Sequence, residues 1–315
     1  MADSAPDAAP APPLPSSAPD TVDPPAPPPP PPPAEKPAAS PPVARAGALL
    51  ALDGFLSHLF RCLQTRSGAD AVLMFACYAA RLSGVALETV GRFALHHTAR
   101  KLVAMAFSLP PKTTVVLSST PSPPLAVAAL KLSARLNALS GMISEWRTMG
   151  RLFGLLGLYM GIKGLVLTKT PPSSDPAKRS EQRFNKAVSW AQMLALVSFQ
   201  LQENMAILAQ KKVLPLAPAT IQKVALASVR SWAVYVFLDI GRLLVERMRK
   251  QDSLSAEEKQ AWTEEWSKSL MKSLAWAPLT IHWSMLKGPL PDFMIPVFAI
   301  IPSTSGMIDL WRQTA

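Results

Sequence analysis

The amino-acid sequence predicts an all-α protein: a membrane-associated bundle of long amphipathic and short hydrophobic helices that follows a disordered Pro/Ala-rich N-terminal tail. Eighteen of the 33 prolines lie in residues 1–42, so most of them belong to the tail rather than to the folded part. Beyond residue 46, apolar residues recur at helical spacing, and few runs alternate as a half-buried strand would. The chain is 49% hydrophobic, yet charged residues interrupt its apolar runs. These observations favour helices that lie beside or within a membrane.

Residues 1–46 are expected to form the tail. Residues 1–42 consist largely of Ala, Pro and Ser, with one Lys against five acidic residues, and they offer nothing for a hydrophobic core. Pro27–Pro33 favours an extended polyproline II helix. Such a segment is either a solvating tail, which its low complexity favours, or a ligand for a proline-recognising domain. The basic remainder is expected to fold as one helical domain over residues 47–312.

The first two helices are marked by apolar stripes and a polar break between them. Leu and Phe residues recur every three or four positions over residues 49–63, which predicts a helix there. Residues 67–70 interrupt this pattern and supply Ser67 or Asp70 as the N-cap of a second helix. That helix runs up to a segment near 110–124, whose prolines, serines and threonines predict a mobile loop.

Further helical patterns follow this loop. They cover residues 125–167, 183–212, 219–250 and 253–275, and a last apolar run spans residues 293–308. The pattern over 219–250 ends in a basic cluster, as suits the C-terminus of a helix. The residues of 253–275 mix acidic and basic side chains and predict a solvated helix. Segments near 169–182 and 250–256 are expected to be mobile loops.

No segment has 18 consecutive apolar residues without a charge, which is the simplest mark of a transmembrane helix. Phe293–Ile308 contains 16 residues, about 24 Å as a helix, and is shorter than the ~30 Å hydrocarbon core of a bilayer. Leu152–Thr168 is interrupted by Lys163, whose long side chain can reach toward the membrane interface. Both segments are candidates for short spans or re-entrant elements.

Residues 125–151 combine an apolar stripe with basic edges. The stripe consists of Leu125, Leu132, Leu136, Leu139, Ile143 and Trp146, with Lys131 and Arg135 along one edge and Arg147 and Arg151 along the other. Cations beside an apolar stripe are typical of a helix that lies in the plane of an anionic phospholipid membrane. Taken alone, such a stripe more often marks a helix that packs on other helices.

A stripe of glycines shifts this balance toward the membrane. Steps of four and three residues place on one helical face the glycines Gly150, Gly154, Gly157, Gly161 and Gly164. In water each glycine inside a helix costs about 0.5–1 kcal/mol relative to alanine. In a bilayer a face of small residues lets another helix approach closely. We therefore expect an in-plane amphipathic helix that runs into a membrane-embedded, self-packing helix, and a homo-oligomer.

Motifs for catalysis, cofactors and metals are not found in the sequence. It contains no phosphate-binding loop, no dinucleotide fingerprint and no pair of metal ligands four residues apart on a helix. His96 and His97 are adjacent and so point to different helix faces, and two cysteines cannot form a disulfide framework. The cations are dispersed among Leu-rich helices without a basic and aromatic module for nucleic acid. We expect neither an enzyme, nor a cofactor or metal site, nor a nucleic-acid partner.

Three segments resemble the peroxin-11 family of peroxisomal membrane proteins, in particular its fungal C-type branch. The first comprises residues 52–56 and 65–70, at the start of the helical domain. The second is Ile143–Tyr159, with the sequence ISEWRTMGRLFGLLGLY, and it is similar to the family's passage from amphipathic region to first hydrophobic segment. The third is GPLPD at 288–292, followed by an apolar run and DLW at 309–311. The resemblance covers roughly residues 47–312.

The resemblance implies a protein of the peroxisomal membrane that elongates and constricts this membrane and recruits division factors. In this family the remodelling activity is attributed to a basic amphipathic helix inserted in the cytosolic leaflet, a role that would fall on Leu125–Arg151. The helix here is less densely cationic than in the family's best examples, and the C-terminal segment carries prolines in place of the glycines expected there.

Two other functions remain open on the residues alone. Polar side chains within an apolar pattern could line a pore for small metabolites: Gln192, Gln200, Gln202, Glu203 and Asn204. The same residues could form the solvent face of a peripheral helix, and we favour this interpretation. The tail or the charged segment 253–275 could instead make the chain an adaptor for the division machinery.

Overall fold

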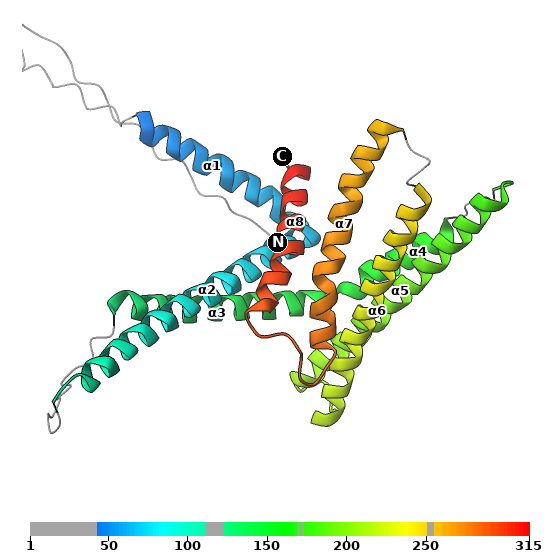
Figure 1. Cartoon of the computed structure of the whole chain (residues 1–315). Coiled ribbons are helices and arrows are strands. Elements are labelled where there is room, and N and C mark those ends of the chain that lie inside the picture. Colours follow the sequence, from blue (N-terminus) through cyan, green and yellow to red (C-terminus); the bar gives the residue numbers. More distant parts are fainter. Residues whose placement is uncertain (1–42, 111–122, 169–170, 172, 251–254) are drawn as a thin grey trace, which may run out of the picture. The chain divides into compact units, whose positions relative to one another are not determined.

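The computed structural model describes residues 43–110, 123–168, 171, 173–250 and 255–315. The chain divides into two units, residues 1–51 and residues 52–315, and the contacts below belong to the second. The helices are α1 (Val43–Leu63), α2 (Arg66–Phe107), α3 (Pro124–Arg151), α4 (Gly154–Leu167), α5 (Pro176–Gln210), α6 (Pro218–Lys250), α7 (Ala256–Trp283) and α8 (Met294–Gln313) (Figure 1). The described residues contain no strand, so the all-α prediction is confirmed for them. Of the expected tail 1–46, residues 1–42 lie outside them, whereas residues 43–46 belong to α1. Most of segment 110–124 and parts of the other two expected loops also lie outside them.

Several element boundaries differ from those the sequence predicts. The pattern over 125–167 forms two helices, α3 and α4, which are bent by 47° relative to each other. Helix α5 begins at Pro176, directly after its N-cap Asp175, so residues 176–182 are helical rather than a loop. Helix α2 is capped by Thr65, whose hydroxyl accepts from the backbone N–H of Gly68, and not by Ser67 or Asp70. Helix α2 therefore begins earlier than expected, because the Thr65 side chain satisfies a backbone N–H of the first turn.

The charged helix α7 has an N-terminus closed by its own side chains. The backbone N–H and the hydroxyl of Ser255 both donate to the carboxylate of Glu258. These hydrogen bonds favour the ionised form and hold the pKa of Glu258 below its ordinary value. The helix then continues through Pro278 to Trp283, beyond the end that its charge pattern predicts.

Most helices pack against the next helix along the chain, and an aromatic cluster joins several of them. Helix α2 packs on α3, α4 on α5, α5 on α6, α6 on α7, and α8 on both α7 and α2. The cluster contains Tyr78 of α2, Phe199 of α5, Trp232 of α6, and Trp276 and Trp283 of α7. In it the ring centroids of Trp232 and Trp276 lie 5.0 Å apart, edge to face. Stacked and edge-to-face rings of this kind add to the free energy of packing.

The end of α8 is held by α1. The rings of His58 and Trp311 stack with their centroids 3.7 Å apart. Nε2 of His58 lies 3.1 Å from the Trp311 carbonyl and 3.0 Å from the hydroxyl of Thr314. Nε of Arg61 donates to the Thr314 carbonyl. Polar groups at the last turn of α8 are therefore satisfied by side chains of α1.

Small side chains form the interior of the described part, while large apolar side chains cover its outside. Eight of the buried apolar residues are alanines, and serines are buried beside them. The exposed side chains include large apolar ones on every helix, among them Phe93, Phe107, Trp146, Leu156 and Met248. A soluble protein buries such side chains because burial of each contributes about 1.5–3 kcal/mol. This reversed distribution is the one expected when lipid surrounds a helical bundle.

Helices α2, α6 and α8 are long and apolar enough to cross a membrane, and α3 and α4 together pass the same test as a bent pair. The sequence prediction did not single out α2 or α6, because charges interrupt their apolar runs. Helix α8 was expected to be too short, but it extends to Gln313, and its 20 residues reach about 30 Å. The test for a spanning helix uses its length and its composition.

Candidate functional site

The predicted membrane-binding helix, α3, packs against α2 along a seam of small residues. Asp70 of α2 pairs with Arg147 of α3, Cys77 lies 3.4 Å from Ser140, and a Cβ added to Gly91 would lie 3.2 Å from the carbonyl oxygen of Ala126. The seam positions recur every seven residues on both helices: Asp70, Cys77, Gly84 and Gly91 on α2, and Ala126, Ser133, Ser140 and Arg147 on α3. A sevenfold repeat keeps two helices in contact over their length, and small side chains bring the backbones close together.

The predicted apolar stripe lies on the face of α3 adjacent to this seam. Its sevenfold positions are exposed: Leu125 by 84%, Leu132 by 47%, Leu139 by 42% and Trp146 by 72%. Leu136 and Ile143, between them, are partly buried. Each stripe residue at these four positions directly precedes a seam residue, and successive residues of a helix are 100° apart. The seam therefore satisfies the small face of α3 and leaves the large apolar face without a partner among the described residues.

The two basic edges of the stripe have different surroundings. Lys131 and Arg135 are exposed. Arg147, whose side chain is only 10% exposed, donates from Nε to Asp70 over 2.9 Å. Arg151 forms an ion pair of 2.9 Å with Glu203 of α5. Two of the four predicted lipid-facing cations thus hold α3 to neighbouring helices, and only Lys131 and Arg135 keep the surroundings that the sequence predicts.

The bend between α3 and α4 is held by side chains from two other helices. Arg66 of α2 donates to the carbonyls of Gly150 and Phe153, over 2.7 and 2.9 Å. Gln200 and Asn204 of α5 donate to the two carbonyls between them, those of residues 151 and 152, over 2.9 and 3.1 Å. Four successive backbone carbonyls at the break therefore accept hydrogen bonds from side chains. Since unsatisfied carbonyls at a helix end are costly, this bend is specified by tertiary contacts.

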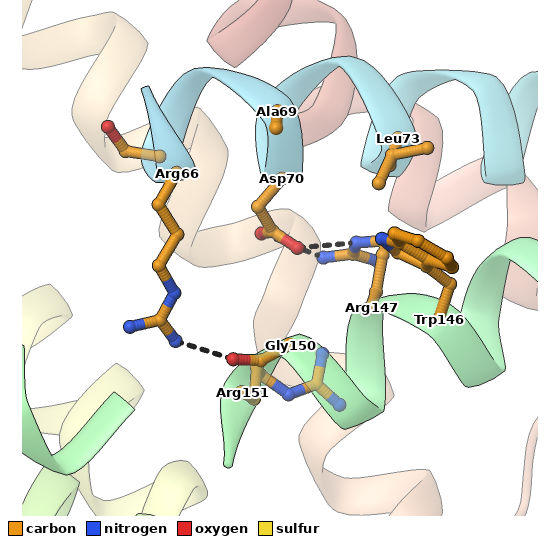
Figure 2. A pocket seen from close by; sticks show the side chains of 9 residues that line it. Arg66, Ala69, Asp70, Leu73, Trp146, Arg147, Gly150 and Arg151 are labelled. Carbon is orange, nitrogen blue, oxygen red and sulfur yellow. Dashed lines mark hydrogen bonds and ion pairs between the residues drawn. The ribbon is translucent and has the colours of Figure 1, made fainter. Parts of the chain in front are cut away.

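Figure 2 shows the surroundings of this bend, where Arg66 reaches the Gly150 carbonyl and Asp70 meets Arg147. A cavity of about 500 Å³ opens here between α2 and α3, beside Trp146. Its three arginines already bind carbonyls or carboxylates. The cavity is consequently part of the bend and not a separate binding site.

The glycine stripe divides between two environments. A Cβ added to Gly154 would lie 2.5 Å from the side-chain oxygen of Gln200, and one added to Gly161 would lie 2.7 Å from Met193. These two glycines admit α5 to α4 within the chain. No atom lies within 4 Å of an added Cβ at the other three: Gly150, Gly157 and Gly164. The stripe predicted to pack against a second copy is thus partly used within the chain, and its open part again repeats every seven residues.

The polar side chains of α5 that suggested a pore have partners within the helix bundle. Gln200 and Asn204 hold the bend, and Glu203 pairs with Arg151. Nε2 of Gln192 donates to Asp239 of α6, and Gln202 donates to Ser198. These contacts within the chain explain why polar residues occur in an otherwise apolar pattern, and the explanation does not require a water-filled pore.

Nothing in the sequence marks Arg66, Gln200 or Asn204 as residues that shape the bend. A sequence signal was present for the seam, because small residues recur every seven positions in both α2 and α3. For the bend there was none, because its donors lie about 50 and 85 residues from the carbonyls that accept from them. Within the described residues, no cluster of three His, Cys, Asp or Glu side chains is placed to hold a metal ion.

Comparisons of the chain with protein-family models, with curated proteins and with solved structures find no significant match. The resemblance to the peroxin-11 family therefore rests on the quoted residues alone.

Proposed function

We propose that this protein inserts the α2–α3 hairpin into one leaflet of the peroxisomal membrane, and by this remodels and elongates the membrane before division. The observation that carries the proposal is the exposed apolar stripe of α3, which lies beside a seam that already satisfies the helix's small face. Because each large side chain transferred out of water contributes about 1.5–3 kcal/mol, the four exposed stripe positions suffice to hold the helix in the interface.

The seam makes the wedge two helices wide. Helix α3 carries the exposed cations Lys131 and Arg135 near its middle, and each would cost about 2.5–3.5 kcal/mol at the centre of a bilayer. This cost favours an in-plane position for α3, and α2 must share it because the seam joins them. Helix α2, with 42 residues, is about 63 Å long and exceeds the ~30 Å hydrocarbon core twofold. Its length is therefore also better accommodated along the interface than across it.

Different observations support the other parts of the proposal, namely the peroxisome, the division factors and the homo-oligomer. The peroxisomal membrane and the division factors follow from the resemblance, which is densest over Ile143–Tyr159, across the bend. The homo-oligomer follows from the open glycines Gly150 and Gly157, which leave room for the backbone of a second copy. A fluorescent fusion of the full chain should coincide with a peroxisomal matrix marker, and a fusion found on another organelle would remove the peroxisome from the proposal.

The wedge is tested by charges placed on the stripe of the full chain. We expect L132E/L139E to abolish tubulation of giant vesicles that contain 30% anionic phospholipid, while the protein still floats with the vesicles through its other apolar helices. The fraction of vesicles with tubules, seen by fluorescence microscopy, is the measurement.

The matched control is Ala134→Glu, compared with Leu132→Glu alone, because each adds one negative charge at an exposed position and the two positions lie about 200° apart around the helix. We expect A134E to tubulate vesicles as the unmodified chain does. Undiminished tubulation by L132E/L139E would exclude the stripe as the wedge. Equal loss with A134E would mean that added negative charge, and not the apolar face, decides the result.

A further inference from the structure

We propose a binding site for the headgroup phosphate of an anionic phospholipid in the cavity between the end of α4 and the first turns of α5. The cavity measures about 500 Å³, which is within the range of small-molecule sites. Arg179, Arg183 and Lys186 line it from α5, and Gly164, Leu165 and Thr168 line it from α4. The site rests on the membrane association proposed above, but it uses none of the residues of the wedge.

The charges of the site are not compensated by neighbouring side chains. Arg179, Arg183 and Lys186 follow each other at steps of four and three, so they share one face of α5. None of them forms an ion pair with a described carboxylate, whereas Arg147, Arg151, Arg242 and Lys272 all do. Arg179 donates from Nε to the Ser173 carbonyl, which fixes its stem and leaves its terminal nitrogens available. Three cations on one face without ion pairs give the cavity a positive potential, which attracts an anion.

The two helices supply different sides of the cavity, and the reason is their packing. Gly154 and Gly161 of α4 admit Gln200 and Met193 of α5, so the helices run antiparallel in close contact. Because a step of seven residues along α4 is matched by seven along α5, the next pair is Thr168 and Lys186. The apolar end of α4 is thereby brought beside the basic start of α5.

Apolar surface continuous with the cavity identifies a lipid rather than a soluble phosphate. Leu165 lines the cavity, and Leu158 and Ile162 precede it by seven and three residues on the same face of α4. No residue of α4 is buried. A phosphate held by Arg183 and Lys186 therefore leaves its attached acyl chains against these side chains. Basic pockets next to apolar helices bind anionic lipid headgroups in this way.

The test is native mass spectrometry of the full chain in a neutral detergent, titrated with phosphatidic acid. We expect saturable binding of one phosphatidic acid in preference to phosphatidylcholine. R183Q/K186Q should weaken it about 25-fold, since each cation near a lipid surface contributes about fivefold. K211Q/K223Q is the matched control, because it removes two exposed cations at the far end of α5 and on α6 and should leave the affinity unchanged. Equal weakening by both variants would overturn the site in favour of diffuse attraction.

A second variant tests the cavity without changing its charge. Nothing lies within 4 Å of a Cβ added to Gly164, so Gly164→Leu is compatible with the fold and fills the cavity from α4. We expect G164L to weaken phosphatidic acid binding at least tenfold, and undiminished binding would overturn the placement. If inorganic phosphate displaced phosphatidic acid and bound as tightly as the lipid does, the site would be one for soluble phosphate instead. Because L132E/L139E leaves this cavity intact, its lipid binding should persist, which separates a failure of this site from a failure of the wedge.

Discussion

At the level of single residues, glycine serves two opposite purposes in this chain. Gly91 lies where two helices meet, and a Cβ there would come within 2.8 Å of Leu130 and 3.2 Å of the Ala126 carbonyl oxygen. Gly157, in the middle of α4, has open space around it. The first glycine permits a contact within the chain, and the second leaves a face free.

This difference predicts opposite effects of the same substitution. Gly91→Ala should destabilise the protein by about 1–3 kcal/mol, because the backbone of α3 must move away from the added methyl group. Gly157→Ala should stabilise the monomer by about 0.4–1 kcal/mol, because alanine has less conformational freedom to lose in a helix. Unfolding in mixed detergent micelles, followed by circular dichroism, measures both. A stabilising Gly91→Ala would contradict the α2–α3 seam.

At the level of elements, the bend between α3 and α4 separates an amphipathic helix from an apolar one. Residues of both helices follow one helical pattern in the sequence, and no proline interrupts it. The carbonyls of residues 150–153 accept instead from Arg66, Gln200 and Asn204. Without these donors, the carbonyls can accept hydrogen bonds only from backbone N–H groups of a continuous helix or from water.

We therefore expect Q200A/N204A to straighten or loosen the bend. Spin labels at residues 131 and 163, in a background with both native cysteines replaced, should give one narrow distance distribution by pulsed electron resonance. In Q200A/N204A the distribution should broaden and shift to longer distances. Gln202→Ala is the control, since Gln202 donates to Ser198 and does not contact the bend. An unchanged distribution in Q200A/N204A would mean that the bend does not depend on these hydrogen bonds.

At the level of the whole described molecule, charged groups near the C-terminal ends of α6 and α8 bind side chains of α7. Lys272 of α7 pairs with Asp309 of α8, and Nε1 of Trp262 donates to Glu246 of α6. Glu246 also binds Arg242 and Lys250. Charges are costly in hydrocarbon, so these ends of α6 and α8 should lie outside the membrane, on one side of it.

Single cysteines at residues 248, 268 and 312, in the same cysteine-replaced background, test this arrangement. All three should react with a membrane-impermeant maleimide from the same side of sealed vesicles, and alkaline carbonate should not extract the protein. Labelling of residue 312 from the side opposite to 248 would contradict the packing of α8 on α7 within a membrane.

The sequence by itself determined the all-α class, the approximate helices and the apolar stripe of α3, because periodicity and local composition decide these features. Only the tertiary structure decided which face of α3 is satisfied, which glycines are occupied, and where the 125–167 pattern breaks. These outcomes depend on partners far away in the chain: Asp70 for Arg147, Met193 for Gly161, and Gln200 for the bend. Such pairings arise when helices dock, and a periodic pattern carries no information about the helix that will meet it.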